Sequence, residues 1–221
     1  MDAKDTPAPF AIDVVSDVVC PWCYVGKRHL EAALAGLPDL DEAVVRWHPF
    51  ELNPELPSAG VDRAAYLEQK FGGPARAAEI YERVREAGRA AGITFDFASI
   101  LRQPNTRDAH RLVAWAQAGG DAKDLVERLF RAYFEEGRFI GDRATLAALA
   151  GEAGLDAQAA RAWLDSGKGA AEIGHAEERA RELGITGVPF FIFDGRVGLS
   201  GAHPPEAMRE AIERARRPEA A

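Results

Sequence analysis

Cysteine is scarce in this sequence of 221 residues, which contains two, Cys20 and Cys23, separated by Pro21 and Trp22. So few cysteines exclude a small scaffold that is held together by several disulfides. Disulfides of cytosolic mesophilic proteins are usually transient, and they serve catalysis or redox sensing. The single Cys-x-x-Cys pair therefore indicates exchange chemistry rather than a structural bridge.

An excess of positive charge, a signal-peptide pattern and long apolar runs are also lacking. The 27 Lys and Arg against 35 Asp and Glu give a net charge of −8, which opposes binding to a nucleic-acid backbone or an anionic lipid surface. Residues 1–10 have neither the basic nor the apolar region of a signal peptide. No apolar run approaches the roughly twenty residues that cross a bilayer. We therefore expect a cytoplasmic protein without nucleic-acid or membrane partners.

Two other interpretations of the cysteine pair compete with exchange chemistry. The cysteines could be inert core residues, or they could supply two of the four ligands of a structural zinc site. The zinc site would need histidines from the set His29, His48, His110, His175 and His203. No second Cys-x-x-Cys and no paired-histidine spacing is present, so we predict no metal site.

The apolar pattern predicts an opening βαβ unit. Residues 10–19 are apolar and β-branched, which favours a strand, and helical spacing follows from Pro21 to about Gly36. Residues 43–52 again resemble a strand, in which Pro49 indicates a sheet edge or a strand end.

Residues 53–183 are almost entirely helical in pattern, with six or seven helices expected. Their predicted N-terminal caps are Asn105 or Thr106, Asp121 and Asp142, and the last of these helices should cover residues 168–183.

Strand character returns near the C-terminus. Residues 189–193 should form a strand buried on both faces, followed by the turn Asp194-Gly195 and a strand over 196–200. Pro204-Pro205 should open a final helix, with a frayed tail over residues 214–221.

The position of the cysteines suits thiol chemistry. A thiolate is the attacking species in disulfide exchange, and a helix N-terminus stabilises an anion. Cys20 lies at such an N-terminus, and Cys23 follows one helical turn later. We predict that Cys20 is the nucleophile and Cys23 the resolving thiol. Pro21 suits the first helical position, and Trp22 should shield or contact the substrate.

The order of these motifs resembles the DsbA-like thioredoxin superfamily, and most closely its FrnE-like branch. The motifs are the strand followed by Cys20-Pro21-Trp22-Cys23-Tyr24, Pro104-Asn105-Thr106 before Ala109-His110-Arg111-Leu112, and Gly187-Val188-Pro189-Phe190-Phe191 before Gly201-Ala202. The resemblance covers residues 10–213.

The resemblance implies an α/β thioredoxin fold, β-α-β and β-β-α, with a large all-helical insertion. Residues 10–52 and 185–217 would form the thioredoxin-like domain, and residues 53–184 the inserted helical domain. It also implies a cis Val188–Pro189 peptide that faces the dithiol and presents the Val188 backbone to the substrate. A cis X-Pro bond is otherwise a minority state.

Two departures limit what the resemblance carries over. Secreted relatives have an export signal, whereas residues 1–10 show no such pattern here. Some FrnE-like proteins have a second cysteine pair, whereas no cysteine follows Cys23 in this sequence. Related isomerases and kappa-class glutathione transferases have serine where Cys20 stands, so a cysteine at this position favours redox chemistry.

Several polar residues have two open interpretations. His110 and Arg111 would make a helix-surface or interdomain contact, or they would contact a substrate. Asn105 and Thr106 would cap a helix or cover the active site. Glu51 and Asn53 would line the cleft or simply belong to a polar loop.

The leading hypothesis is a thiol–disulfide oxidoreductase that exchanges disulfides with protein or low-molecular-weight thiols. It would bind no cofactor, with glutathione as a candidate co-substrate. The alternatives are a glutathione-dependent isomerase or transferase for a small aromatic or polyketide-like compound, and a chaperone that binds extended peptide. Family analogy suggests a homodimer.

Overall fold

The computed structural model describes residues 9–217, apart from the side chain of Pro74. In this range the elements are, in chain order, β1 (Ala11–Ser16), α1 (Pro21–Ala35), the short 3-10 helix η1 (Pro38–Leu40), β2 (Val44–Pro49), β3 (Val61–Asp62), α2 (Arg63–Phe71), α3 (Pro74–Ala90), β4 (Arg102–Gln103), α4 (Arg107–Gly119), α5 (Lys123–Phe134), α6 (Arg143–Glu152), α7 (Ala157–Asp165), α8 (Ala170–Glu182), β5 (Phe190–Phe193), β6 (Val197–Ser200) and α9 (Pro205–Arg216).

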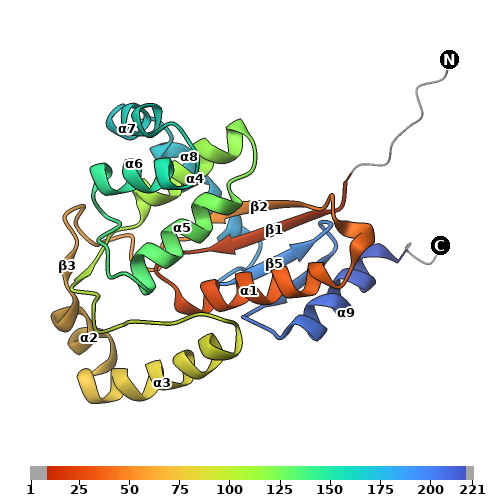
Figure 1. Ribbon diagram of the computed structural model, residues 1–221, viewed down its shortest axis with the longest axis horizontal. Helices are drawn as coiled ribbons and strands as arrows, with labels where there is room; N and C mark the ends of the chain where they lie inside the picture. Colours follow the sequence, from red (N-terminus) through yellow and green to blue (C-terminus); the bar gives the residue numbers. More distant parts are fainter. Residues whose placement is uncertain (1–8, 218–221) are drawn as a thin grey trace.

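A four-stranded sheet with the order β2-β1-β5-β6 lies at the centre of the fold (Figure 1). Strand β1 runs parallel to β2 and antiparallel to β5, and β6 pairs antiparallel with β5. The chain thus begins with a β-α-β unit and ends with a β-β-α unit. Both units of the predicted thioredoxin fold are confirmed.

The two faces of the sheet are covered by different helices. Helices α1 and α9 pack side by side against one face (Figure 1), where Ile12 and Val14 of β1 meet Phe191 and Phe193 of β5. The opposite face carries a smaller cluster that includes Val15 of β1 and Ala180 of α8. The alternation of side chains along a strand places these two sets on opposite faces.

The hairpin between β5 and β6 turns at Asp194 and Gly195, as predicted. Both residues have positive φ, 51° and 66°, which is the backbone of a type I′ turn. The prediction that the β5 strand is buried on both faces is wrong, because Phe190 and Ile192 are only partly buried. Their face is covered by the small cluster alone.

Strand β2 lies at the edge of the sheet, and Pro49 is its last residue, as the sequence indicated. The free backbone of this edge is occupied at one point by a side chain from α4. The Trp47 amide donates to Gln117 Oε1 at 2.7 Å, and Gln117 Nε2 donates to the Trp47 carbonyl at 3.4 Å. Gln117 thereby replaces one residue of a neighbouring strand.

Seven α-helices, α2 to α8, lie between β2 and β5 in the described residues, within the predicted range of six or seven. The insertion is not all-helical, however. Strands β3 and β4 pair antiparallel, with Val61 opposite Gln103. Two-residue strands are too short to show an alternating pattern, so the sequence could not reveal them. The division into two domains stays a prediction. One would consist of residues 10–52 and 185–217, and the other of residues 53–184.

Helix ends follow the expected chemistry only in part. Asp142 caps α6 by accepting from the Thr145 amide at 2.8 Å, as predicted. Asp121 lies one residue too early, because Ala122 is the cap residue of α5. Thr106 precedes α4 without a side-chain capping bond, whereas Asn105 Oδ1 accepts from the Arg107 amide at 3.0 Å.

Helix α9 continues further than predicted. It extends to Arg216, so the expected fraying from Arg214 is wrong within the described residues. Ala215 is fully buried, and its carbonyl accepts a hydrogen bond from Arg196 at 3.1 Å, which holds the last turn in place. The part of the predicted frayed tail over residues 218–221 lies outside the described residues.

Candidate active site

Cys20 and Cys23 lie at the start of α1, where the chain leaves β1. Cys20 is the N-terminal cap residue with extended backbone, and Pro21 is the first helical residue, as predicted. The Cys20 amide donates to the Asp17 carbonyl at 3.0 Å, which fixes the approach of the chain to the helix. Both side chains are free thiols, with relative exposures of 5% for Cys20 and 2% for Cys23.

The Val188–Pro189 peptide is cis and faces Cys20, which confirms the expectation drawn from the resemblance. The Cys20 thiol donates to the Val188 carbonyl with an Sγ to O distance of 3.6 Å. The loop before β5 therefore forms one wall beside the nucleophile.

Gly26 in α1 allows this loop to come close to the helix. A Cβ atom at this position would lie 3.0 Å from Phe191 Cζ and 3.1 Å from Pro189 Cγ. Such contacts are tighter than ordinary van der Waals packing, so a side chain at position 26 would separate α1 from Pro189. The absence of a side chain thus helps to place Cys20 beside Val188.

The environment of Cys23 favours its protonated form. Burial raises the pKa of the Cys23 thiol well above its ordinary value, and the neighbouring Cys20 raises it further. The Ser16 hydroxyl and the Asp17 backbone act in the opposite direction, because their hydrogen bonds to Cys23 lower its pKa. The deeper sulfur therefore holds its proton, whereas Cys20 is the cap residue at the tip of the helix.

Asp17 is a buried carboxylate next to the dithiol, and the sequence reasoning did not single it out. Its Oδ2 accepts from the Leu52 amide at 2.8 Å, and its Oδ1 is 3.3 Å from His110 Nε2. These bonds connect the β1–α1 loop with the loop after β2 and with α4. Asp17 thus holds three segments together around the cysteines.

His110 and Arg111 are both buried, so the interpretation as an exposed helix-surface contact is wrong, and both side chains contact other segments of the chain instead. His110 meets Asp17, whereas Arg111 donates to the carbonyls of Trp163 and Leu164, each at 3.2 Å. Arg111 therefore connects α4 with the end of α7, and only His110 borders the site.

Glu51 does not line a cleft. Its side chain is buried and accepts from Arg107 at 2.8 Å, and its backbone amide donates to Glu177. Burial raises the pKa of Glu51, and the Arg107 guanidinium lowers it by a smaller amount. Its second carboxylate oxygen has no hydrogen-bond partner among the described residues.

A cavity of about 220 Å³ adjoins the dithiol and opens between α1, α2 and α3. Trp22 lines it with 38% of its surface exposed, in accord with a side chain that can contact a substrate. Asn53 lines it as well, which supports the cleft interpretation of this residue. The lining consists of Val19, Pro21, Trp22, Leu52, Asn53, Arg63, Tyr66, Lys70, Phe71, Ile80, Tyr81, Val84 and Gln103.

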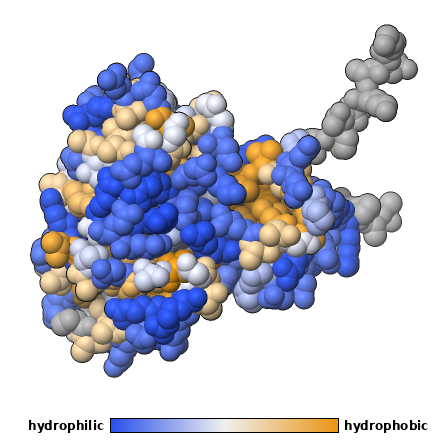
Figure 2. Space-filling model, viewed as in Figure 1, coloured by the Kyte–Doolittle hydropathy of each residue, from blue (hydrophilic) through white to orange (hydrophobic). Residues whose placement is uncertain are grey.

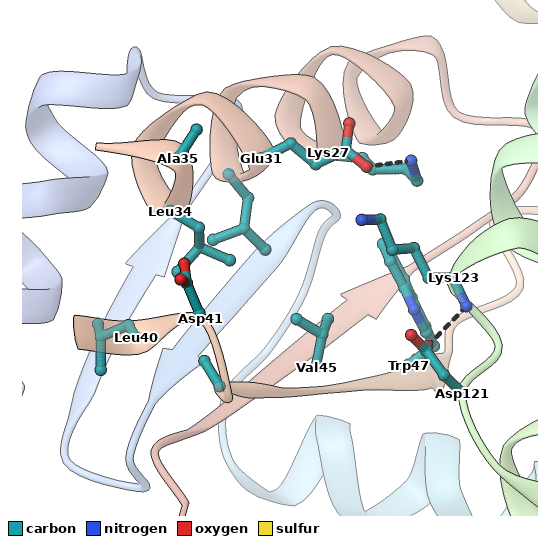
Figure 3. Close-up of a pocket in the computed structure, with 12 residues that line it drawn as sticks. Lys27, Glu31, Leu34, Ala35, Leu40, Asp41, Val45, Trp47, Asp121 and Lys123 are labelled. Atoms are coloured by element: carbon teal, nitrogen blue, oxygen red, sulfur yellow. Dashed lines mark hydrogen bonds and ion pairs between the residues drawn. The ribbon is translucent and has the colours of Figure 1, made fainter. Parts of the chain in front are cut away.

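A larger cavity, of about 350 Å³, lies elsewhere, between α1 and β2. Figure 2 shows it as an apolar hollow, and Figure 3 shows Leu34, Leu40 and Val45 around it. A salt bridge between Lys27 and Glu31, 2.7 Å long, lies at its border. None of residues 19–23, which include the dithiol and its neighbours, lines this cavity, so its size does not mark it as the active site.

Two further histidines, His48 and His29, have hydrogen-bond partners away from the dithiol. His48 Nε2 lies 2.7 Å from Asp13, and His29 Nδ1 lies 2.9 Å from the His203 carbonyl. Within residues 9–217 no group of three or more histidine, cysteine or acidic side chains is placed to hold a metal ion. No helix in the same range has the length and apolarity needed to traverse a bilayer.

The site thus combines a dithiol at a helix tip with a cis-proline loop that faces it. Comparison of the whole chain with known proteins gives its family. Residues 11–213 match the family described as the DSBA-like thioredoxin domain. The chain belongs to the DsbA-like thioredoxin family. Its FrnE-like branch stays a prediction.

Known proteins resemble the chain over nearly its whole length. The uncharacterised protein YwbO of Bacillus subtilis is 31% identical over 207 residues, which are 91% of this chain and 94% of that protein. The crystal structure of a probable DsbA oxidoreductase from Streptomyces coelicolor has a TM-score of 0.85 and 33% identity, covering 96% of this chain and 93% of the other. The cytosolic disulfide reductase DsbM from Pseudomonas aeruginosa shares the fold, with a TM-score of 0.67 and 23% identity over 92% of this chain and 97% of the other.

Proposed function

We propose that this DsbA-like protein is a thiol–disulfide oxidoreductase in which Cys20 attacks and Cys23 resolves. The observation that carries the proposal is the difference between the two sulfurs. Cys20 lies at the helix tip beside the Val188 carbonyl, 3.6 Å away, whereas burial raises the pKa of Cys23. These differences favour Cys20 as the thiol that reacts first and Cys23 as the thiol that reacts in the second step.

The reaction has two displacement steps. The Cys20 thiolate attacks one sulfur of a disulfide R–S–S–R, which forms a mixed disulfide and releases one thiolate of R. Cys23 then loses its proton and attacks Cys20, which closes the Cys20–Cys23 disulfide and releases the second thiolate. Two electrons pass from the protein to the substrate, and two R–SH are formed once the thiolates are protonated. The reverse sequence oxidises a substrate dithiol.

The substrates proposed here are protein disulfides and low-molecular-weight thiols or disulfides, with glutathione as one candidate co-substrate and no bound cofactor. A cytoplasmic location and a homodimer belong to the same proposal. Activity in the cytoplasm requires a reductant that restores the dithiol, and a small thiol of this class would supply it.

The test uses two single variants and wild-type protein. Cys20→Ser is expected to lose the reduction of insulin or of small disulfides, because the attacking sulfur is gone. Cys23→Ser is expected to accumulate a covalent adduct of the small thiol on Cys20, visible by intact-protein mass spectrometry, because nothing resolves it. Unfolding temperatures of both variants control for loss of structure. Unchanged turnover in Cys20→Ser would refute the proposal.

A second candidate is a glutathione-dependent isomerase or transferase, and the cavity lined by Tyr66, Phe71 and Tyr81 favours it because an aromatic compound fits there. This activity needs no resolving thiol. Cys23→Ser would retain such turnover, whereas it would block a complete disulfide exchange cycle.

A further inference from the structure

Arg63 is a buried cation beside the dithiol. It is the first residue of α2, is 8% exposed and lines the cavity that Pro21 and Trp22 also line. Its guanidinium carbon lies 5.6 Å from the ring centre of Tyr66 and 5.7 Å from that of Tyr81. Both rings line the same cavity, so the charged end of Arg63 lies among side chains of that lining.

The hydrogen-bond partners of Arg63 are neutral. Its guanidinium donates to Gln103 Oε1, to the Tyr81 hydroxyl at 2.5 Å and to the Tyr133 hydroxyl at 3.5 Å. Its Nε has no partner, and across residues 9–217 no carboxylate oxygen comes within the 4.0 Å of an ion pair. A buried charge without a counter-charge is costly, so the guanidinium calls for an anion that this part of the chain does not supply.

Lys70 adds a second positive charge to the same cavity. Its Nζ donates to the Tyr66 hydroxyl at 2.6 Å and lies 5.1 Å from the centre of the Tyr66 ring. No aspartate or glutamate lines the cavity, although the chain as a whole carries a net charge of −8. The charged side chains of the lining are therefore all positive, and they attract anions to this place.

The size and lining of the cavity restrict the ligand. Its volume of about 220 Å³ is below the roughly 300 Å³ at which pockets for drug-sized ligands begin. Phe71, Ile80 and Val84 add apolar surface to the lining. A short acid arm or a benzoate-like ring fits this combination, whereas a folded protein domain does not.

We propose that this cavity is a binding site for the carboxylate of a low-molecular-weight disulfide, held by Arg63 with Lys70 while a sulfur of the same molecule lies against Cys20. The inference rests on the proposed function and specifies its substrate class. Planar guanidinium and carboxylate groups can form two parallel hydrogen bonds, which would orient the substrate as well as hold it. The exchange step is the one given above, in which the mixed disulfide forms on Cys20 and one thiolate leaves.

The experiment compares two aromatic disulfides with the fully reduced protein. Dithiobis(nitrobenzoate) carries two carboxylates, dithiodipyridine is neutral, and each releases a product that can be followed by its own absorption band. The second-order rate constant is measured for both, and their ratio defines the preference for the anionic substrate. The intrinsic reactivity of each reagent cancels when the preference of a variant is divided by that of the wild type.

Arg63→Met removes the charge at similar length, and the preference is expected to fall by about tenfold or more, as for loss of a charge-assisted hydrogen bond. Arg63→Lys keeps the charge without the planar fork, so its preference should lie between those of the wild type and Arg63→Met. Lys70→Met should lower the preference less, because Lys70 is exposed. Lys123→Met is the matched control, since it removes one exposed lysine from the border of the other cavity (Figure 3) and should leave the preference as in the wild type.

A second readout does not depend on a charged disulfide, because inhibition is measured on the exchange with the neutral dithiodipyridine. Benzoate should inhibit the wild type competitively and benzamide should not, and the inhibition by benzoate should weaken in Arg63→Lys and Arg63→Met and at high salt. If Arg63→Met fails to fold, Arg63→Lys and Lys70→Met still test the site.

The outcomes separate this inference from the proposed function. If the wild type reacts with both disulfides but its preference is the same in every Arg63 and Lys70 variant, the carboxylate site is refuted and the dithiol chemistry stands. If the reduced wild type reacts with neither disulfide through Cys20, the proposed function itself fails.

Discussion

Cys20 and Cys23 are one helical turn apart, yet their surroundings differ in polarity. Cys20 is the cap residue of α1 and contacts the Val188 carbonyl, whereas Cys23 lies deeper against Ser16. Ser16 is the last residue of β1 and is itself buried, so its hydroxyl contacts Cys23 in an environment with little competing water. In such surroundings a single hydrogen bond has a larger effect on the stability of a thiolate.

Removal of the Ser16 hydroxyl should therefore slow the second displacement step. The Ser16 bond lowers the pKa of Cys23, so in Ser16→Ala the pKa rises further above the ordinary value for cysteine. Below this pKa the thiolate fraction falls as the pKa rises, and resolution of the mixed disulfide becomes slower at neutral pH. The pH profile of the resolution rate, measured by stopped flow after loading Cys20, should move to higher pH.

Ser166→Ala provides the control for Ser16→Ala, because Ser166 bonds the Trp163 carbonyl near the end of α7 and touches neither cysteine. A profile for Ser16→Ala that moves to lower pH, or that coincides with the wild type, would contradict the role assigned to the hydroxyl.

At this scale the sequence was informative where chemistry is local. Cys20, Pro21 and Cys23 are adjacent in the chain, and a strand followed by a helix is enough to place them. Val188–Pro189 could be assigned only through the resemblance to the DsbA-like family. Arg63 gave no local signal, because its neighbours Gln103 and Tyr133 are 40 and 70 residues away in the chain.

Among the helices, α3 shows how packing can override local preference. Gly88 lies within α3, where alanine would ordinarily be more favourable by about 0.5–1 kcal/mol. A Cβ atom at this position would lie 2.5 Å from Cδ2 of Phe95. Phe95 stacks on Phe97, which in turn stacks on Tyr81 of α3, so the ring cannot easily move away.

Gly88→Ala should consequently destabilise the protein by about 1–2 kcal/mol, since overpacking exceeds the gain in helix propensity. Gly174→Ala in α8 is the matched variant, because nothing lies within 4 Å of a Cβ there. It should raise the free energy of unfolding by up to about 1 kcal/mol. Urea denaturation of the two variants measures the change in the free energy of unfolding for each. A more stable Gly88→Ala would show that the Phe95 ring can move to make room for the methyl group.

The elements themselves were largely predictable from periodicity, and their ends were not. The strands of the central sheet and most helices were recognised from apolar spacing and from glycine and proline. The predicted start of α5 is one residue too early, because aspartate is a favourable cap residue and Asp121 precedes the actual cap residue, Ala122. The contacts that hold the end of α9, through Arg196 and Ala215, come from a distant strand connection and leave no mark in the local sequence.

Across the whole molecule, one apolar core passes from the sheet into the inserted helices. Tyr24 of α1 stacks on Phe130 of α5 with ring centres 5.0 Å apart, and it meets Phe95 at 6.0 Å. The Tyr24 hydroxyl also donates to Glu135 at 2.6 Å. The sheet part of the chain therefore shares buried contacts with two segments of the insertion.

This shared core should give a single cooperative unfolding transition. Far-ultraviolet circular dichroism reports mainly on the inserted helices, and fluorescence of a Trp115→Phe, Trp163→Phe double variant reports on Trp22 and Trp47 near the sheet. The urea midpoints from the two signals should coincide. Separate midpoints would mean that the predicted domains, residues 53–184 and the remainder, unfold independently.

The hydrogen bonds between Gln117 and the backbone of Trp47 bear on how copies of this protein can meet. An unoccupied edge strand is a template for intermolecular pairing, from swapped dimers to fibrils. With one amide and one carbonyl of β2 already bound by a side chain of the same molecule, an incoming strand must first displace Gln117. Self-association by pairing of β2 with a strand of another copy is thereby disfavoured. We expect any homodimer to form through contacts between helices instead.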